Sequence, residues 1–334
     1  MTLMTLRSTP RARFWLTLVL VLQCSAWPAA AETLIVGAAA PSPGQCALLM
    51  AKDLGLFQTQ GLDVEFVFFD SGTESMQALV GGRVPVHAVG GAAAINAALA
   101  GADVVLIASF VNTLSYALVV VPEIATPADL KGKALGINRF GSSNDFATRL
   151  LLTRLGLRPD RDVTLLQLGA STARLAAMQA RGIHGALLEP GALAASRRLG
   201  FIELADLSRL DVRYPLEAIA VSRAFAREHP ETLRQFLRGL VLGIHAFRTR
   251  PDEARRAMRT YLKVQDAEVL ATVYAYYAPL VEPRPFVPLE GVRTILDELA
   301  IRNPQARTAK PEDFLDMRLL KEVDDSGFID RLYR

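Results

Sequence analysis

The sequence predicts an α/β protein of two lobes, each a mostly parallel sheet flanked by helices. Two observations lead to this prediction. Short apolar segments rich in Val, Ile and Leu alternate with segments whose apolar residues follow helical spacing. This alternation runs through about residues 33–108 and starts again at about residue 134. The 334 residues, 51% of them hydrophobic, are enough to bury two such cores.

Residues 1–31 are predicted to be a cleaved signal peptide. Arg7, Arg11 and Arg13 precede the apolar run 14–22, and the alanines at 29–31 suit signal peptidase. The apolar run has about half the length that spans a bilayer. Lipidation of Cys24 is the weaker alternative, because the residue before it is the large Gln23. The mature protein is therefore expected in the periplasm.

Composition excludes several functional classes. Residues 1–31 hold three of the 37 Lys and Arg residues and none of the 34 Asp and Glu residues, so the mature chain has no net charge. This balance argues against a nucleic-acid partner. Cys46 is the one cysteine that remains, which rules out an intramolecular disulfide. We expect Cys46 to be a small buried hydrophobic residue.

No metal, cofactor or catalytic residue is predicted. The four histidines, His87, His184, His229 and His245, lack the spacing of a His-Glu-x-x-His motif. The sequence contains no nucleophile elbow and no phosphate-binding glycine loop. Tyr274, Tyr276 and Tyr277 are expected to pack against the protein rather than to bind a ring.

The elements of the first lobe follow one another closely. Strands are expected at 33–37, 63–69, 87–89 and 104–108, and helices at 46–54, 75–80 and 92–99. In the second lobe, strands are expected at 134–137, 163–168 and 185–188, and helices at 145–155, 172–179 and 192–199. After these, helices are expected at 231–247, 252–261, 266–277 and 289–299, with a short helical segment from 311.

The two lobes resemble weak internal copies. At an offset of 99, Thr73 matches Thr172 and Gly101 matches Gly200. Recurrence of similar supersecondary units remains the alternative. The runs 118–122 (LVVVP) and 216–221 (LEAIAV) suit a two-strand hinge. We therefore assign 32–120 and 217–334 to the first lobe and 121–216 to the second.

Four sequence runs carry a family resemblance: AKDLGLF at 51–57, GLDV at 61–64, PADLKGKALG at 127–136 and HPE at 229–231. In this order they resemble a group of periplasmic solute-binding proteins of ABC importers. The group includes receptors for sulfonates, taurine, nitrate and thiamine-pyrimidine precursors. The sequence departs from the group's pattern at two places, because 83–85 (RVP) and 182–184 (GIH) lack the aspartate often found there.

The resemblance implies a type II periplasmic-binding-protein fold without catalytic activity. A small-molecule ligand would bind between the lobes, at the carboxyl ends of the strands. The closed form would then dock, as a monomer, on an ABC permease. An enzyme on the same fold and a receptor that presents its ligand to a sensor are the alternatives.

The loops that lead from strands into helices hold the first candidate ligand-binding residues. Exposed backbone N–H groups at helix starts suit polar or anionic groups, although the same residues are also the favoured helix N-caps. These candidates are Ser42, Gln45, Ser71, Gly72, Thr73, Ser142, Ser143, Asn144 and Ser171.

Four further candidates lie at strand ends or beside these loops. Gly91 offers bare backbone, and Glu189 accepts an amino or amide group or stabilises the hinge. Arg139 suits a carboxylate or sulfonate and Phe140 a flat ring, or else the arginine is solvated and the phenylalanine belongs to the core. Low charge favours a weakly charged or aromatic organic ligand, and a sulfonate or nitrate-like anion remains open.

Overall fold

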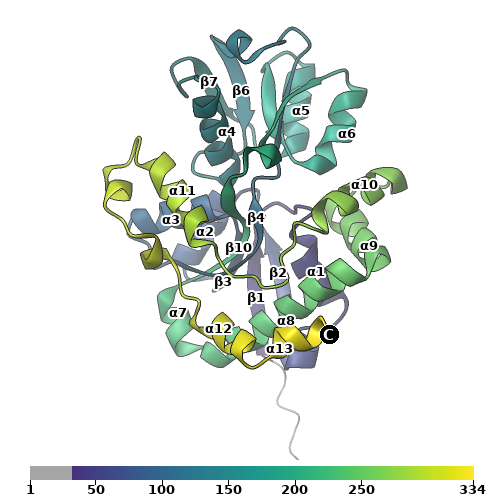
Figure 1. Cartoon of the computed structure of the whole chain (residues 1–334), viewed down its shortest axis with the longest axis vertical. Helices are drawn as coiled ribbons and strands as arrows, with labels where there is room; N and C mark the ends of the chain where they lie inside the picture. Colours follow the sequence, from purple (N-terminus) through teal and green to yellow (C-terminus); the bar gives the residue numbers. More distant parts are fainter. Residues whose placement is uncertain (1–31) are drawn as a thin grey trace, which may run out of the picture.

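A computed structural model describes residues 32–334, so the predicted signal peptide lies outside the described residues. Figure 1 shows two lobes stacked along the long axis, with β6, β7, α4, α5 and α6 in one lobe and β1–β4 and β10 in the other. Each lobe contains one five-stranded sheet with helices packed against it. The predicted fold class is therefore confirmed.

The first sheet has the strand order β2-β1-β3-β10-β4. Strand β1 pairs in parallel with β2 and β3, whereas β10 pairs antiparallel with β3 and β4. Helices α1 (Cys46–Asp53), α2 (Gly72–Val80) and α3 (Gly91–Leu99) connect the parallel strands. The strands are β1 (Glu32–Ala38), β2 (Leu62–Phe68), β3 (Val86–Val89), β4 (Val105–Thr113) and β10 (Arg213–Val221).

The second sheet has the order β7-β6-β8-β5-β9. Strand β6 pairs in parallel with β7 and β8, and β5 pairs antiparallel with β8 and β9. Helices α4 (Ser143–Arg154), α5 (Ser171–Gln179) and α6 (Pro190–Arg198) connect its strands. The strands are β5 (Ala117–Val120), β6 (Lys133–Ile137), β7 (Val163–Gln167), β8 (Gly185–Leu188) and β9 (Ile202–Asp206).

The two sheets share one topology. In each, the second parallel strand lies at one edge, the first lies beside it, the third follows, and a single antiparallel strand comes next. The antiparallel strand is β10 in the first sheet and β5 in the second. This common order agrees with the prediction of two similar lobes.

The strand pairing corrects the predicted boundary between the lobes. Residues 117–120 were assigned to the first lobe, but as β5 they pair with β8 and β9 of the second sheet. The chain passes between the sheets after Thr113 and returns before Arg213, so β10 begins earlier than the predicted return at 217. The sequence could not assign β5 to the correct lobe, because β5 is buried along its whole length and a buried apolar segment fits the interior of either sheet.

The C-terminal helices cover the first lobe. Helix α8 (Pro230–Thr249) buries Leu233, Phe236, Leu237 and Leu240 on one face, which packs against α1. Helix α10 (Ala267–Tyr277) reaches across to α6 of the second lobe. The other helices are α7 (Arg223–Glu228), α9 (Pro251–Leu262), α11 (Leu289–Leu299), α12 (Arg318–Asp325) and α13 (Phe328–Leu332). Within residues 32–334, no helix combines the length and apolar character needed to cross a membrane.

Candidate ligand-binding site

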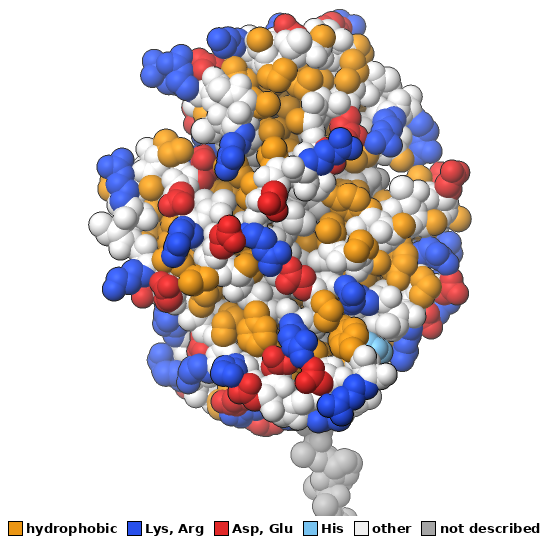
Figure 2. All heavy atoms as spheres, in the orientation of Figure 1, with side chains coloured by type: hydrophobic (Ala, Val, Ile, Leu, Met, Phe, Trp, Pro, Cys, Tyr) orange, Lys and Arg blue, Asp and Glu red, His pale blue; other side chains and the backbone are white. Residues whose placement is uncertain are grey.

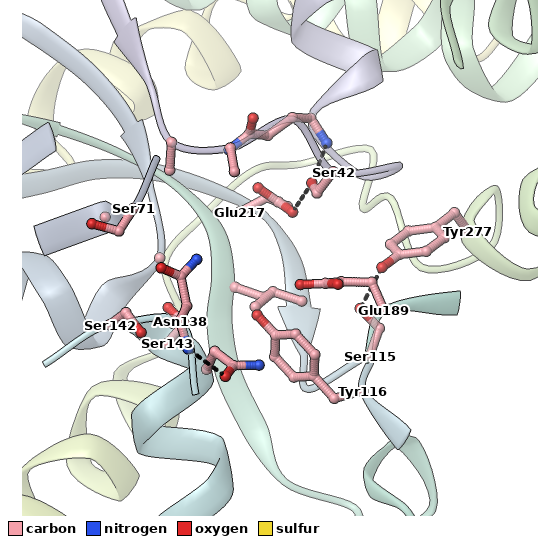
Figure 3. A pocket seen from close by; sticks show the side chains of 17 residues that line it. Ser42, Ser71, Ser115, Tyr116, Asn138, Ser142, Ser143, Glu189, Glu217 and Tyr277 are labelled. Carbon is pink, nitrogen blue, oxygen red and sulfur yellow. Dashed lines mark hydrogen bonds between the residues drawn. The ribbon is translucent and has the colours of Figure 1, made fainter. Parts of the chain in front are cut away.

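A cavity of about 80 Å³ lies between the lobes. It opens at the carboxyl ends of β1, β3, β6 and β8, where a ligand is expected in open α/β sheets. Figure 3 shows side chains from both lobes around it. Eight predicted residues line the cavity: Ser42, Gln45, Ser71, Gly72, Ser142, Ser143, Asn144 and Glu189.

Glu217 of β10 forms the wall of the first lobe. Its side chain is 4% exposed and accepts a hydrogen bond from Ser42 Oγ. The backbone N–H of Gln45 donates to the same Ser42 Oγ at 3.2 Å. The loop before α1 is thus fixed to β10 across 175 residues of sequence.

The environment of Glu217 opposes ionisation. Burial raises the pKa of this carboxyl to about 7, hydrogen bonds from Ser42 and Gln45 lower it, and the Glu189 carboxylate raises it. A group with this pKa changes charge near neutral pH. The charge of Glu217 can therefore respond to a ligand that binds beside it.

Glu189 forms the opposite wall, at the end of β8. Ser171 Oγ donates to its carboxylate, and an Arg174 nitrogen lies 3.7 Å from its other oxygen. Arg174 is 1% exposed and also donates to the Leu187 carbonyl oxygen at 2.6 Å. Arg174 thus stands behind Glu189 and does not line the cavity.

Two tyrosines complete the lining. Tyr277 of α10 exchanges a 2.7 Å hydrogen bond with Ser115 Oγ. Burial raises the pKa of both Tyr116 and Tyr277 well above the usual phenol value, so both side chains stay neutral. Tyr277, which the sequence led us to regard only as a packing residue, lies at the cavity.

The predicted helix-start residues also cap their helices. Ser71 Oγ accepts from the N–H of Glu74 at 3.2 Å, and Ser142 Oγ accepts from the N–H of Asp145 at 3.3 Å. Asn144 donates to the Leu187 carbonyl at 3.2 Å and is buried. Ser71 and Ser142 therefore both cap their helices and line the cavity.

Five predicted residues do not line the cavity. The Thr73 hydroxyl donates to the Phe140 carbonyl, and Arg139 pairs with Glu74. Phe140 is 44% exposed and, with Thr73, lines a separate pocket beside α2 and α3. The Ser171 hydroxyl is held by Glu189 and Arg174.

Gly91 is the fifth of these residues. A β-carbon there would come within 2.5 Å of Pro215, so the glycine serves packing between α3 and β10.

Gly90, which with Gly91 was expected to offer bare backbone to a ligand, also lines the cavity. The lining includes further residues that the sequence reasoning missed: Ala39, Ala40, Ser115, Tyr116, Asn138, Leu216, Glu217 and Tyr277. Glu217 carried a signal, because it is the single charged residue in the apolar run 216–221. A carboxylate in a buried strand requires a partner, which makes it a functional candidate.

Several hydrogen bonds close the lobes along one side. Asn138 donates to the Asp70 carbonyl at 3.2 Å, and Tyr214 Oη donates to Ser143 Oγ at 2.6 Å. A β-carbon on Gly90 would lie 1.9 Å from Ser143 Oγ, so only a glycine permits this approach. The structure therefore has the two lobes in direct contact beside the cavity.

The described residues contain no group of three or more His, Cys, Asp and Glu side chains able to hold a metal ion. Cys46 is free and fully buried, as predicted. On the face shown in Figure 2, acidic and basic side chains are intermixed rather than gathered by sign.

Comparisons with known proteins agree with this architecture. A structure from Bordetella bronchiseptica RB50 gives a TM-score of 0.78 at 20% identity, over 88% of this chain and 98% of that one. The alkanesulfonate-binding protein SsuA from Xanthomonas axonopodis pv. citri gives a TM-score of 0.68 at 20% identity, over 84% and 95%. These likenesses confirm the predicted fold.

Sequence comparison identifies the family. The taurine-binding periplasmic protein of Escherichia coli (strain K12) is 28% identical over 227 residues, which are 66% of this chain and 69% of that protein. The predicted resemblance to this group of receptors is thereby confirmed. A model of the NMT1/THI5-like family matches residues 42–254, which is more than half of the sequence. The chain therefore belongs to the NMT1/THI5-like family.

Proposed function

We propose that the protein is the substrate-binding component of an ABC-type importer. It captures a small organic molecule between its lobes and delivers it to a membrane permease. The observation that carries this proposal is a polar cavity lined from both lobes at the carboxyl ends of their strands, in a chain of the NMT1/THI5-like family.

Within this proposal, the cavity-lining residues contact the ligand. Ser42, Gln45 and Glu217 act from the first lobe, and Ser142, Ser143 and Glu189 act from the second. Ligand contacts on both walls favour the closed arrangement of the lobes, which is the form that a permease would recognise. The predicted signal peptide directs the protein to the periplasm, where the E. coli taurine-binding relative is found.

Binding without chemical conversion is part of the proposal. Among the residues that line the cavity in the described part of the chain, none is a histidine, lysine or cysteine. The cavity is instead lined by hydroxyl, amide and carboxyl groups, which suit hydrogen bonding to a ligand.

A ligand screen followed by an uptake assay tests this function. Protein produced from the full-length gene is screened by thermal shift against sulfonates, nitrate, amines and heteroaromatic compounds. A ligand at a hundred times its Kd stabilises the fold by about 2.7 kcal/mol. The bound compound is then recovered and its mass compared with the original.

Cells that lack the gene are expected to lose saturable uptake of that compound, and the wild-type gene is expected to restore it. An altered mass would point to an enzyme. Normal uptake with a lost transcriptional response would point to a sensor receptor. Either result would refute the importer assignment.

A further inference from the structure

The cavity between the lobes has an excess of hydrogen-bond acceptors. Glu217 and Glu189 bring two carboxylates to it. The side-chain oxygen of Gln45, a residue that is 3% exposed, has no hydrogen-bond partner among the described residues, and neither has that of Asn138. No lysine, arginine or histidine lines this cavity within residues 32–334. The buried side-chain atoms of this cavity that lack a partner among the described residues are therefore acceptors, and the ionisable acids of the lining have no basic side chain beside them in it.

The orientation of the two amides is set by their neighbours. Asn138 Nδ2 donates to the Asp70 carbonyl oxygen at 3.2 Å, and the Gln45 amide donates to the Glu217 carboxylate. Rotating either amide would bring its oxygen against another acceptor. Both unpartnered atoms are therefore oxygens, which accept hydrogen bonds and cannot donate them.

The two carboxylates differ in how the protein offsets their charge. Arg174 lies 3.7 Å from Glu189 and offsets part of its charge from behind. The groups that act on Glu217 are Ser42, Gln45 and Glu189, and none of them is a cation. An ionised carboxylate that is 4% exposed without a cationic partner is costly. A ligand could supply the positive charge that the protein does not place beside Glu217.

We propose that the ligand carries a protonated amine or amidine, which binds between Glu217 and Glu189 with the side-chain oxygens of Gln45 and Asn138 as further acceptors. An ammonium has three N–H donors and no acceptor, so it matches this set. A ligand that presented only sulfonate or nitrate oxygens here would place acceptors against acceptors. This inference rests on the proposed receptor function and adds the chemical class of the ligand.

Figure 3 shows how the recognising groups are divided between the lobes. Glu217 comes from β10 of the first lobe, and Glu189 follows β8 of the second. A cation held by both carboxylates would attract the two lobes toward each other, since without it the carboxylates repel. The same group would then provide recognition and favour closure.

Calorimetry with matched ligands tests the inference. The protein, made from the full-length gene, is unfolded in urea and refolded to remove any bound compound. Taurine is compared with isethionate, which has a hydroxyl in place of the amine. Ethylammonium and guanidinium serve as cations without an acid, and ethanesulfonate and nitrate as anions without an amine.

Two substitutions accompany the ligands. Glu217→Gln removes the charge and keeps an acceptor for Ser42, and Glu65→Gln makes the same change at an exposed residue of β2. We expect taurine to bind at least about tenfold more tightly than isethionate, and Glu217→Gln to weaken amine binding by about 10- to 100-fold. Glu65→Gln is expected to leave the amine affinity unchanged.

The outcomes separate this inference from the receptor function. If ethanesulfonate or nitrate binds and no amine does, the inference is wrong and the receptor function stands. The inference also fails if Glu217→Gln binds amines as tightly as the wild type. If no compound binds, both the inference and the receptor proposal lose their support.

Discussion

The buried carboxyl of Glu217 is expected to make the stability of the ligand-free protein depend on pH. Its usual pKa of 4.5 is raised to about 7 in the fold, chiefly by burial. Between these values the unfolded chain ionises while the folded chain still holds the proton. The unfolded state then binds fewer protons, so the free energy of unfolding falls as pH rises. The stabilisation is complete below pH 4.5 and is lost as pH passes 7.

The size of this effect follows from the pKa difference. A shift from 4.5 to about 7 corresponds to about 3 kcal/mol at 25 °C. For a folded chain of this length, with an unfolding entropy of about 2.1 cal/mol/K per residue, each kcal/mol moves the melting temperature by about 1.5–2 °C. Relative to Glu217→Gln, which does not titrate, the wild type is therefore expected to lose about 4–6 °C between pH 4.5 and 8.

Circular dichroism melts at half-unit pH steps measure this difference. Both tryptophans lie within residues 1–31, so tryptophan fluorescence is a poor probe of the fold formed by residues 32–334. Glu65→Gln is the control, because Glu65 is exposed and lies away from the cavity. A constant difference in melting temperature between wild type and Glu217→Gln from pH 4.5 to 8 would refute the reasoning, and so would a difference that moved in the wild type's favour.

Three further predictions concern packing and burial. A β-carbon on Gly243 would lie 2.4 Å from a backbone carbonyl oxygen of α1, so Gly243→Ala is expected to cost about 1–3 kcal/mol in thermal unfolding. Gly191→Ala, where the β-carbon meets nothing within 4 Å, should instead leave the melting temperature equal or higher, and equal losses from both would contradict this account. Tyr214→Phe leaves the buried N–H of Ala92 without its 3.1 Å acceptor and should destabilise by about 1–3 kcal/mol in the same assay, whereas an unchanged melt would show that another group replaces it. The thiol of Cys46 is fully buried and its pKa is raised, so a thiol reagent should modify it in urea and leave the native protein unmodified.

Regular elements with a clear period could be predicted from the sequence. Helix α11 and strand β8 have the predicted bounds, because helical spacing and short apolar runs are local properties. Strand β9 was missed. Its residues are exposed or half-buried at the edge of the second sheet, so its pattern lacks the apolar run that marks a buried strand.

The site was predictable where it depends on strand-to-helix loops. Ser42, Ser71 and Ser142 line the cavity because parallel strands bring the starts of their helices to one edge. Arg139 and Phe140 come two and three residues after the end of β6, yet Arg139 pairs with Glu74 and Phe140 lines a separate pocket. Their proximity in sequence to the loop did not fix the direction of their side chains.

The sequence by itself determined the class of this protein, through its two α/β units and the runs that resemble periplasmic receptors, and it predicts a leader for export. Only the tertiary structure decided the chemistry of the cavity. Glu217 meets Ser42 across 175 residues because the chain leaves the first sheet, builds the second and returns as an antiparallel strand beside β3. The period of the apolar residues in a sequence indicates which face of a helix or strand is buried. Which buried charged residues lie opposite each other depends on how segments far apart in the sequence pair in the fold.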